Sequence, residues 1–290
     1  FHGNNHTNYE LASPNTDDEA LAMMAQGMRR IRAFERRTGL AVDRVMTPPH
    51  GRCSTRIAEA LFRLGFDGLC IDDVYSWSSE TDPDPVLHGW FPADLVAGGL
   101  PVLPRTLFEH DPRELAFRAF LRHPLVIYGH HQDVAEGLEV LRSFTDLTNS
   151  FGEVRWSGLD EILTTNVATR VDGSQLRARV YSREVEFDVP DGVDEVVVET
   201  PGVAGLSDTT QIDLGGPVAY TTDANRIISS PVEASPGKVR VSFAPKSPVD
   251  ADSVPAPPSR PWPMVRRVLT ESRDRAMPLA PGALSRLQRS

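Results

Sequence analysis

The chain has 290 residues, which is enough for one large domain and a smaller one. Its 40% hydrophobic and 24% charged residues are typical of a globular protein, and it has no run of about 18 apolar residues, the length that a membrane-spanning helix needs. The net charge of −10 disfavours binding to nucleic-acid phosphates and leaves a neutral or cationic substrate as the easier partner.

Helix and strand patterns alternate through the first 165 residues. A capping box at Thr16 and Glu19 predicts a helix that ends near Gly39 and buries a stripe of methionine, leucine and isoleucine side chains. The elements expected after it are a strand at 40–46, a helix at 54–64, a strand at 68–71, a polar loop at 72–85, an apolar segment at 100–103, a helix at 112–121, a strand at 124–128, a helix at 134–149, a strand at 154–156 and a helix at 159–163. Such alternation predicts a parallel sheet or a βα barrel, with the chemistry at the carboxyl ends of the strands.

The pattern changes near residue 166 to short alternating strands. These are expected at 175–181, 184–189, 195–199, 211–214 and 238–243, with Asp-Gly turns at 172–173 and 191–192. We therefore predict three parts: an α/β domain at 1–165, a small all-β, sandwich-like domain at 166–245, and a Pro-rich linker with a basic tail at 246–290.

All 8 histidines lie within the first 131 residues, and some fall in three short motifs. The first motif, at residues 1–6, holds His2 and His6, whose spacing lets two imidazoles converge on one metal ion. The second, at 46–51, holds His50, and the third, at 128–133, holds His130 and His131. His50 and His130 each follow a predicted strand, so we expect them at the same edge of the sheet. Cys53 and Cys70 have no zinc-knuckle spacing and are expected to be buried thiols, with a disulfide left open.

These motifs resemble those of the NodB-type polysaccharide deacetylases (carbohydrate esterase family 4), over about residues 1–165. His2-Gly3-Asn4-Asn5-His6 is similar to the family's His-Ser/Thr-x-x-His metal motif. Thr47-Pro48-Pro49-His50-Gly51 matches the family's Arg-x-Pro-x-Gly turn at its proline and its final glycine. Val126-Ile127-Tyr128-Gly129-His130 resembles the apolar strand that ends at a catalytic histidine.

The resemblance implies a deformed (β/α) barrel that lacks its first strands and removes acetyl groups from a glycan. His2 and His6 would bind a divalent metal ion, with Zn²⁺ expected, and His130 would donate a proton to the leaving amine. The residues expected to line the substrate site are Thr47, Pro49, His50, Gly51 and His131. Aromatic residues that are candidates to stack on a sugar, with core packing as the alternative, are Tyr75, Trp77 and Trp90.

The chain departs from the family pattern at three points. Gly3 stands where the family has Ser or Thr, whose hydroxyl helps to hold the metal loop, and Thr47 stands where the family has Arg. The family's Asp-Asp motif, which supplies a base and a metal ligand, would lie upstream of Phe1, and we do not assign Asp72 and Asp73 to that role. A site with two ligands binds metal weakly, so the chain as given is expected to be feebly active or inactive.

Two other functions stay open. The first is a NodB-like domain that binds a glycan or a partner without chemistry. The departure at Thr47 and the missing Asp-Asp motif favour it. The second is a metal-dependent hydrolase of the same architecture that acts on C–N bonds in compounds other than sugars.

Overall fold

The computed structural model describes residues 1–5, 10–71, 89–108, 111–135, 137–204, 210–224 and 226–258, and six positions between 261 and 272. The chain divides into two compact units, Phe1–Pro255 and Ala256–Ser290. The first is a mixed α/β structure with a large mixed sheet, as the predicted class requires. None of the described helices combines the length and the apolar character that crossing a membrane takes.

The helices of the first unit belong mainly to its N-terminal part. The α-helices are α1 (Asp17–Thr38), α2 (Thr55–Arg63), α3 (Pro112–Phe120), α4 (Glu139–Ser150) and α5 (Leu159–Thr165), and the short 3₁₀ helices are η1 (Glu10–Ala12), η2 (Pro49–Gly51), η3 (His131–Val134) and η4 (Ala251–Ser253).

The strands are short in the N-terminal part and longer after residue 166. They are β1 (Val45–Met46), β2 (Gly68–Ile71), β3 (Asp94–Val96), β4 (Leu100–Leu107), β5 (Val126–Tyr128), β6 (Val167–Asp172), β7 (Gln175–Val180), β8 (Glu184–Val189), β9 (Glu195–Ala204), β10 (Thr210–Asp213), β11 (Pro217–Val218), β12 (Tyr220–Asp223), β13 (Arg226–Ser229), β14 (Val232–Glu233) and β15 (Gly237–Pro245).

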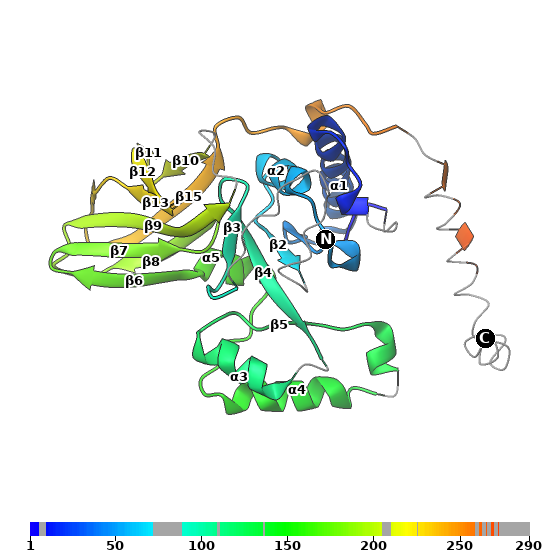
Figure 1. Ribbon diagram of the computed structural model, residues 1–290, viewed down its shortest axis with the longest axis horizontal. Coiled ribbons are helices and arrows are strands. Elements are labelled where there is room, and N and C mark those ends of the chain that lie inside the picture. The colour runs from blue at the N-terminus through cyan, green and yellow to red at the C-terminus, as the bar shows by residue number, and fades with distance from the viewer. Residues whose placement is uncertain are drawn as a thin grey trace. The chain divides into compact units, whose positions relative to one another are not determined.

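The first four parallel strands place their carboxyl ends at one edge of the sheet. β1 pairs with β2, β2 with β4, and β4 with β5, each in parallel (Figure 1). The segments that leave this edge include the turn after β1 and the loop after β5. Both histidine-bearing segments therefore lie at the same edge, as the alternating pattern predicts.

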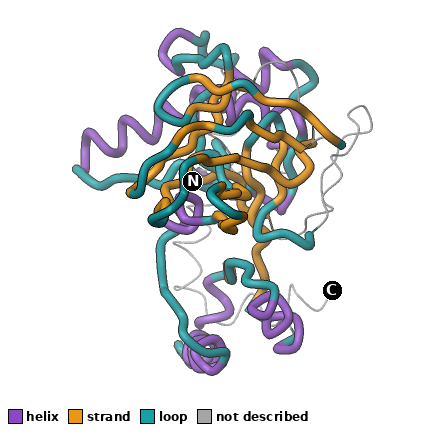
Figure 2. The backbone as a smooth tube through the Cα atoms, turned by 90° about the vertical axis from the view of Figure 1, so that its left-hand side faces the viewer, coloured by secondary structure: helices purple, strands orange, loops and turns teal. Residues whose placement is uncertain are grey.

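The sheet continues from the α/β part into the β-rich part. β3 turns back antiparallel on β4 and pairs in parallel with β9, which leads to β13 and β12. β7 also pairs with β9, and β6 with β7. A second sheet has the order β11-β10-β15-β8. In Figure 2 the strands cross the middle of the view, and most helices lie toward its margins.

Two predicted helices begin where their capping residues indicate. The Thr16 hydroxyl accepts a hydrogen bond from the Glu19 N–H at the start of α1, and the Ser54 hydroxyl accepts one from the Ile57 N–H at the start of α2. Each cap satisfies a backbone donor that the first helical turn leaves without a partner. Gly39 ends α1 in the left-handed conformation, with φ of 72°.

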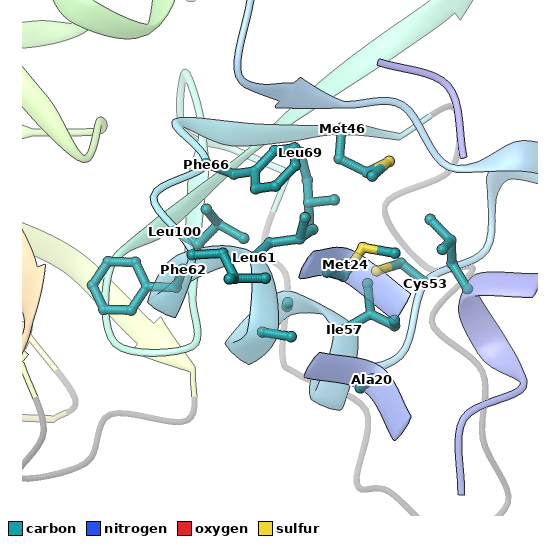
Figure 3. Close-up of a cluster of buried hydrophobic side chains, with 14 of the residues drawn as sticks. Ala20, Met24, Met46, Cys53, Ile57, Leu61, Phe62, Phe66, Leu69 and Leu100 are labelled. Atoms are coloured by element: carbon teal, nitrogen blue, oxygen red, sulfur yellow. The ribbon is translucent and has the colours of Figure 1, made fainter. Parts of the chain in front are cut away.

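The core of the α/β part packs α1 and α2 against the parallel strands (Figure 3). Met24, Ile57, Leu61, Phe66 and Leu69 are fully buried, and each such side chain contributes about 1.5–3 kcal/mol through burial. The predicted methionine stripe is therefore core.

The two cysteines are buried thiols and form no disulfide. Burial disfavours the thiolate and raises the pKa of Cys53 far above its ordinary value. Cys53 lies in the helix-packed core shown in Figure 3, whereas Cys70 lies in a separate cluster with Leu103 and Leu163.

The β-rich part has one core between its two sheets. Inward side chains of β7, β9 and β13 in the large sheet meet those of β8, β10 and β15 in the four-stranded sheet. Strand β7 alternates strictly, with Leu176, Ala178 and Val180 buried and the residues between them facing outward. This alternation is the pattern from which the strands were predicted.

Several predicted elements were wrong in extent or in kind. The strand expected at 40–46 contains only Val45–Met46, and the helix expected at 134–149 begins at Glu139, after Gly137 with φ of 128°. Segment 154–156 is not a strand, and Trp156 is 56% exposed, because a short Val-Arg-Trp segment forms a strand only where a neighbouring strand is available to pair. β3 was not predicted, β4 continues to Leu107 in spite of two prolines, and the polar loop at 72–85 lies outside the described residues.

Candidate functional site

The first residues of the chain run beside β1. The Phe1 nitrogen donates to the Val45 carbonyl at 2.9 Å, and the Thr47 N–H donates to the Phe1 carbonyl at 2.8 Å. Phe1 is thus hydrogen-bonded to the residues before and after Met46, which is the hydrogen-bond pattern of two parallel strands. His2 therefore leaves the sheet at the same edge as the turn that follows β1.

His2 is bonded to that turn. Its Nδ1 lies 3.0 Å from the carbonyl oxygen of Thr47. When Nδ1 donates its proton to the carbonyl, Nε2 carries the lone pair that a metal ion would use. A backbone carbonyl on the remote ring nitrogen is the usual support of a metal-bound histidine, so the donor chemistry of His2 fits a metal ligand.

Gly3 is in a conformation and a space that only glycine accepts. Its φ is +64°, and a Cβ atom there would lie 2.4 Å from Cγ of Pro49 and 2.5 Å from Oε1 of Glu10. A Ser or Thr at this position would collide with both groups. The first and second motifs are in contact here, because Pro49 belongs to the turn after β1.

The second motif forms a tight turn. Pro49 and Gly51 are buried in η2, whereas the His50 side chain is exposed and its backbone has φ of 58°. Thr47 uses its N–H and its carbonyl on the first two residues of the chain. Pro49 and Gly51 are thus packed inside the turn, and His50 faces the surface.

A network of side chains holds the segment between the two histidines of the first motif. The Glu10 carboxylate accepts hydrogen bonds from the backbone N–H groups of Asn4 and Asn5, the latter at 2.9 and 3.1 Å. From α1, Gln26 accepts from the Asn4 side-chain amide at 2.6 Å, and Arg30 donates to Oδ1 of Asn4 at 2.6 Å and Oδ1 of Asn5 at 3.1 Å.

The third motif has a similar anchor. The His130 N–H donates to Oδ2 of Asp133 at 2.6 Å, and a Cβ atom on Gly129 would lie 2.8 Å from the same oxygen. The Tyr128 ring meets the His130 ring edge-on, with centroids 6.2 Å apart, and the Arg105 guanidinium lies 4.1 Å above the Tyr128 ring. The His130 side chain is exposed.

The structure thus brings the first two motifs into contact. The third motif follows the same end of a parallel strand but lies farther along the sheet, because Tyr128 at the end of β5 is opposite Leu107, whereas Met46 at the end of β1 is level with Val102. β5 pairs with Arg105–Leu107 of β4, beyond Pro104, the last β4 residue that pairs with β2. His6, the side chain of His131, Tyr75 and Trp77 lie outside the described residues, and Trp90 is 67% exposed. Among the residues that are described, no three His, Cys, Asp or Glu side chains are grouped so as to hold a metal ion.

Sequence reasoning missed Glu10, Gln26 and Arg30. A single Glu after an Asn-rich stretch belongs to no recognisable motif. The two α1 residues lie outside the apolar stripe by which that helix is predicted. Their roles depend on contacts across 5 to 26 residues, which no spacing rule reports.

His123 was also not singled out. It is 6% exposed and its Nε2 lies 3.1 Å from the Trp90 carbonyl. Burial lowers its pKa, and the hydrogen bond to Trp90 opposes that effect. Its side chain is packed inside the protein, and it belongs to none of the three motifs.

Comparison with known proteins returns no matching family model, no matching curated protein and no matching solved structure. The geometry of the three motifs is therefore the basis for proposing a function.

Proposed function

We propose that this chain is a NodB-like deacetylase region, a deformed (β/α) barrel of a metal-dependent hydrolase that removes acetyl groups from a glycan. The contact between His2 Nδ1 and the Thr47 carbonyl, at 3.0 Å, carries the proposal. It joins the metal motif to the turn that lines the substrate site in the family, and it gives His2 the support that metal-bound histidines have.

The residues have separate roles in this proposal. His2 and His6 hold the ion, with Zn²⁺ as the expected metal. A bound ion would supply polarisation of the acetyl carbonyl and a lowered pKa for a water molecule, whose proton a carboxylate would take. His130, exposed after β5, donates the proton that the leaving amine needs.

The remaining motif residues shape the site for the acetylated sugar. Buried Pro49 and Gly51 set the turn, and Thr47 anchors it to the first motif. His50 and His131 are the polar side chains assigned to substrate contact.

The experiment measures Zn²⁺ binding by calorimetry and acetate release from N-acetylglucosamine oligomers. His2→Ala is expected to lower Zn²⁺ affinity by more than tenfold, whereas Lys246→Ala, at an exposed position after β15, leaves it unchanged. Equal affinity of the His2→Ala variant and the parent chain would sink the metal assignment.

Thr47 favours a second candidate, a NodB-like domain that binds glycan without chemistry. Its short side chain stands where the family has a charged Arg, and its backbone N–H and carbonyl are both taken up by the first two residues. Binding of N-acetylglucosamine oligomers that is independent of Zn²⁺, with no acetate released, would support this candidate. Hydrolysis of a cyclic amide in preference to acetylated sugars would support the third, a hydrolase of C–N bonds outside sugars.

A further inference from the structure

We infer that Glu10 is a positioning residue, whose carboxylate takes the place of the missing side chain at Gly3 and fixes the segment between His2 and His6. The inference rests on the proposed function, because it assigns the fixed segment to metal binding. The geometry of the segment can be tested separately from the metal.

The first observation is where the carboxylate lies. Glu10 is 3% exposed, and its Oε1 would be 2.5 Å from a Cβ atom on Gly3, so together with the Pro49 ring it fills the volume that a side chain at residue 3 would need. A Ser or Thr hydroxyl at that position would bond to the loop from within. Here the carboxylate of Glu10, which lies outside the segment in sequence, makes these bonds, and glycine at residue 3 leaves room for it.

The second observation is what the carboxylate bonds. It accepts from the N–H groups of two successive residues, Asn4 and Asn5. Hydrogen bonds from backbone N–H groups to an ionised carboxylate are among the strong ones in proteins, and burial excludes the water that would compete for them. The backbone between the histidines is thus held at two adjacent peptide groups.

The third observation is that α1 holds the other side of the same segment. Arg30 donates to the carbonyl and side-chain oxygens of Asn4, and Gln26 accepts from its amide nitrogen. Since α1 is a long capped helix packed into the core, the segment is held between a buried carboxylate and a rigid helix. Such support is what a metal ligand needs to keep its geometry without metal.

The loop after β5 also has a carboxylate bonded to its backbone, but in a different setting. Asp133 accepts from the His130 N–H at 2.6 Å and is exposed, and the space beside Gly129 is filled first by the Phe108 ring. The buried carboxylate that fills the space beside a glycine is therefore described for the first motif.

The test compares Glu10→Gln with Glu19→Gln. Glu19 also accepts a backbone N–H, that of Asn15 at 2.9 Å, but at an exposed site outside the motif, which makes it the matched control. Amide hydrogen exchange at Asn4 and Asn5 reports the loop, and calorimetry with Zn²⁺ reports the metal. Glu10→Gln is expected to speed exchange at both amides by at least tenfold and to weaken Zn²⁺ binding 10- to 100-fold, and Glu19→Gln to change neither.

The outcomes separate the two claims. Unchanged exchange at Asn4 and Asn5 in folded Glu10→Gln overturns the positioning role, whatever the metal does. Faster exchange with Zn²⁺ affinity equal to the parent's overturns the link to metal binding. Faster exchange when neither parent nor variant binds Zn²⁺ supports the loop anchor and overturns the proposed function. If Glu10→Gln does not fold, Arg30→Ala removes the outer hydrogen bonds at a solvent-exposed position, and the same two measurements decide.

Discussion

The imidazole of His2 and the carbonyl of Thr47 lie 3.0 Å apart, although 45 residues separate them in the chain. This contact joins the motif at residues 1–6 to the motif at residues 46–51. It also means that changes in the turn after β1 are expected to reach His2 through the backbone, without any change to the histidine itself.

Gly3→Ala is expected to destabilise the protein by about 2–4 kcal/mol, from an unfavourable positive φ and collisions with Pro49 and Glu10. Gly173→Ala is the matched control, since its φ is also +64° but nothing lies within 4 Å of the added atom. Urea unfolding of both variants separates backbone strain from steric overlap. Equal losses in the two would show that the packing around Gly3 is not tight.

Replacing His123 is expected to change the pH dependence of stability. Burial lowers the pKa of His123, so below about pH 6.5 the unfolded chain binds a proton that the folded chain does not. The stabilisation that uncharged His123 contributes is fully present above the pKa of the unfolded state. It falls as the pH falls toward the folded pKa, and the free energy of unfolding then changes by up to about 1.4 kcal/mol per pH unit. His123→Gln, which retains a donor for the Trp90 carbonyl, removes that slope.

Unfolding of both proteins in urea between pH 5 and 8 checks this. Identical slopes for the parent and His123→Gln would contradict it, because the carboxyl groups that also titrate are common to both.

Glu199→Gln is expected to cost about 1–2 kcal/mol at pH 7, since Glu199 accepts from Arg177 at 2.8 Å and Arg179 at 3.4 Å on β7. Burial by itself raises the pKa of Glu199, but these two hydrogen bonds outweigh it and the pKa lies below its ordinary value. The stabilisation is therefore present above the unfolded pKa, about 4.3, and is lost as pH falls through the folded pKa.

Glu186→Gln is the control for this prediction. Its pair with Lys238 is exposed on both sides and screened by solvent, so its loss is expected to leave the free energy of unfolding nearly unchanged. Thermal unfolding at pH 7 and pH 3 compares the two variants, and an equal cost at pH 7 would contradict the importance of the shared carboxylate.

Arg183→Lys is expected to lower the free energy of unfolding by about 1–3 kcal/mol, because Arg183 joins the α/β part to the β-rich part. The Arg183 guanidinium donates to the Phe66 carbonyl at 2.7 Å and to the Phe243 carbonyl at 3.3 Å, and lies 5.1 Å above the Phe62 ring. A lysine ammonium is a point charge that cannot make this planar, forked contact. Urea unfolding measures the loss, and stability equal to the parent's would show that the fork is dispensable.

Much of the fold was predictable where the signal is local. Thr16, Ser54 and Gly39 mark helix ends because side-chain caps and a left-handed glycine act within one turn. Alternation in β7 and β8 predicted strands because a sheet with one buried face imposes a period of two. The same local rules failed at 154–156 and at 134–138, where pairing partners and backbone dihedrals decided the outcome.

The sequence by itself determined the ends of α1, the start of α2, the buried stripe of α1 and the strands β7 and β8, since these depend on neighbours along the chain. Only the tertiary structure decided that residue 3 must be glycine, that Glu10 and Arg30 hold the segment after His2, and that the first two motifs touch. The physical reason is the same in each case. Excluded volume and hydrogen bonds act between atoms close in space, and the parallel strands bring together groups that the sequence keeps apart.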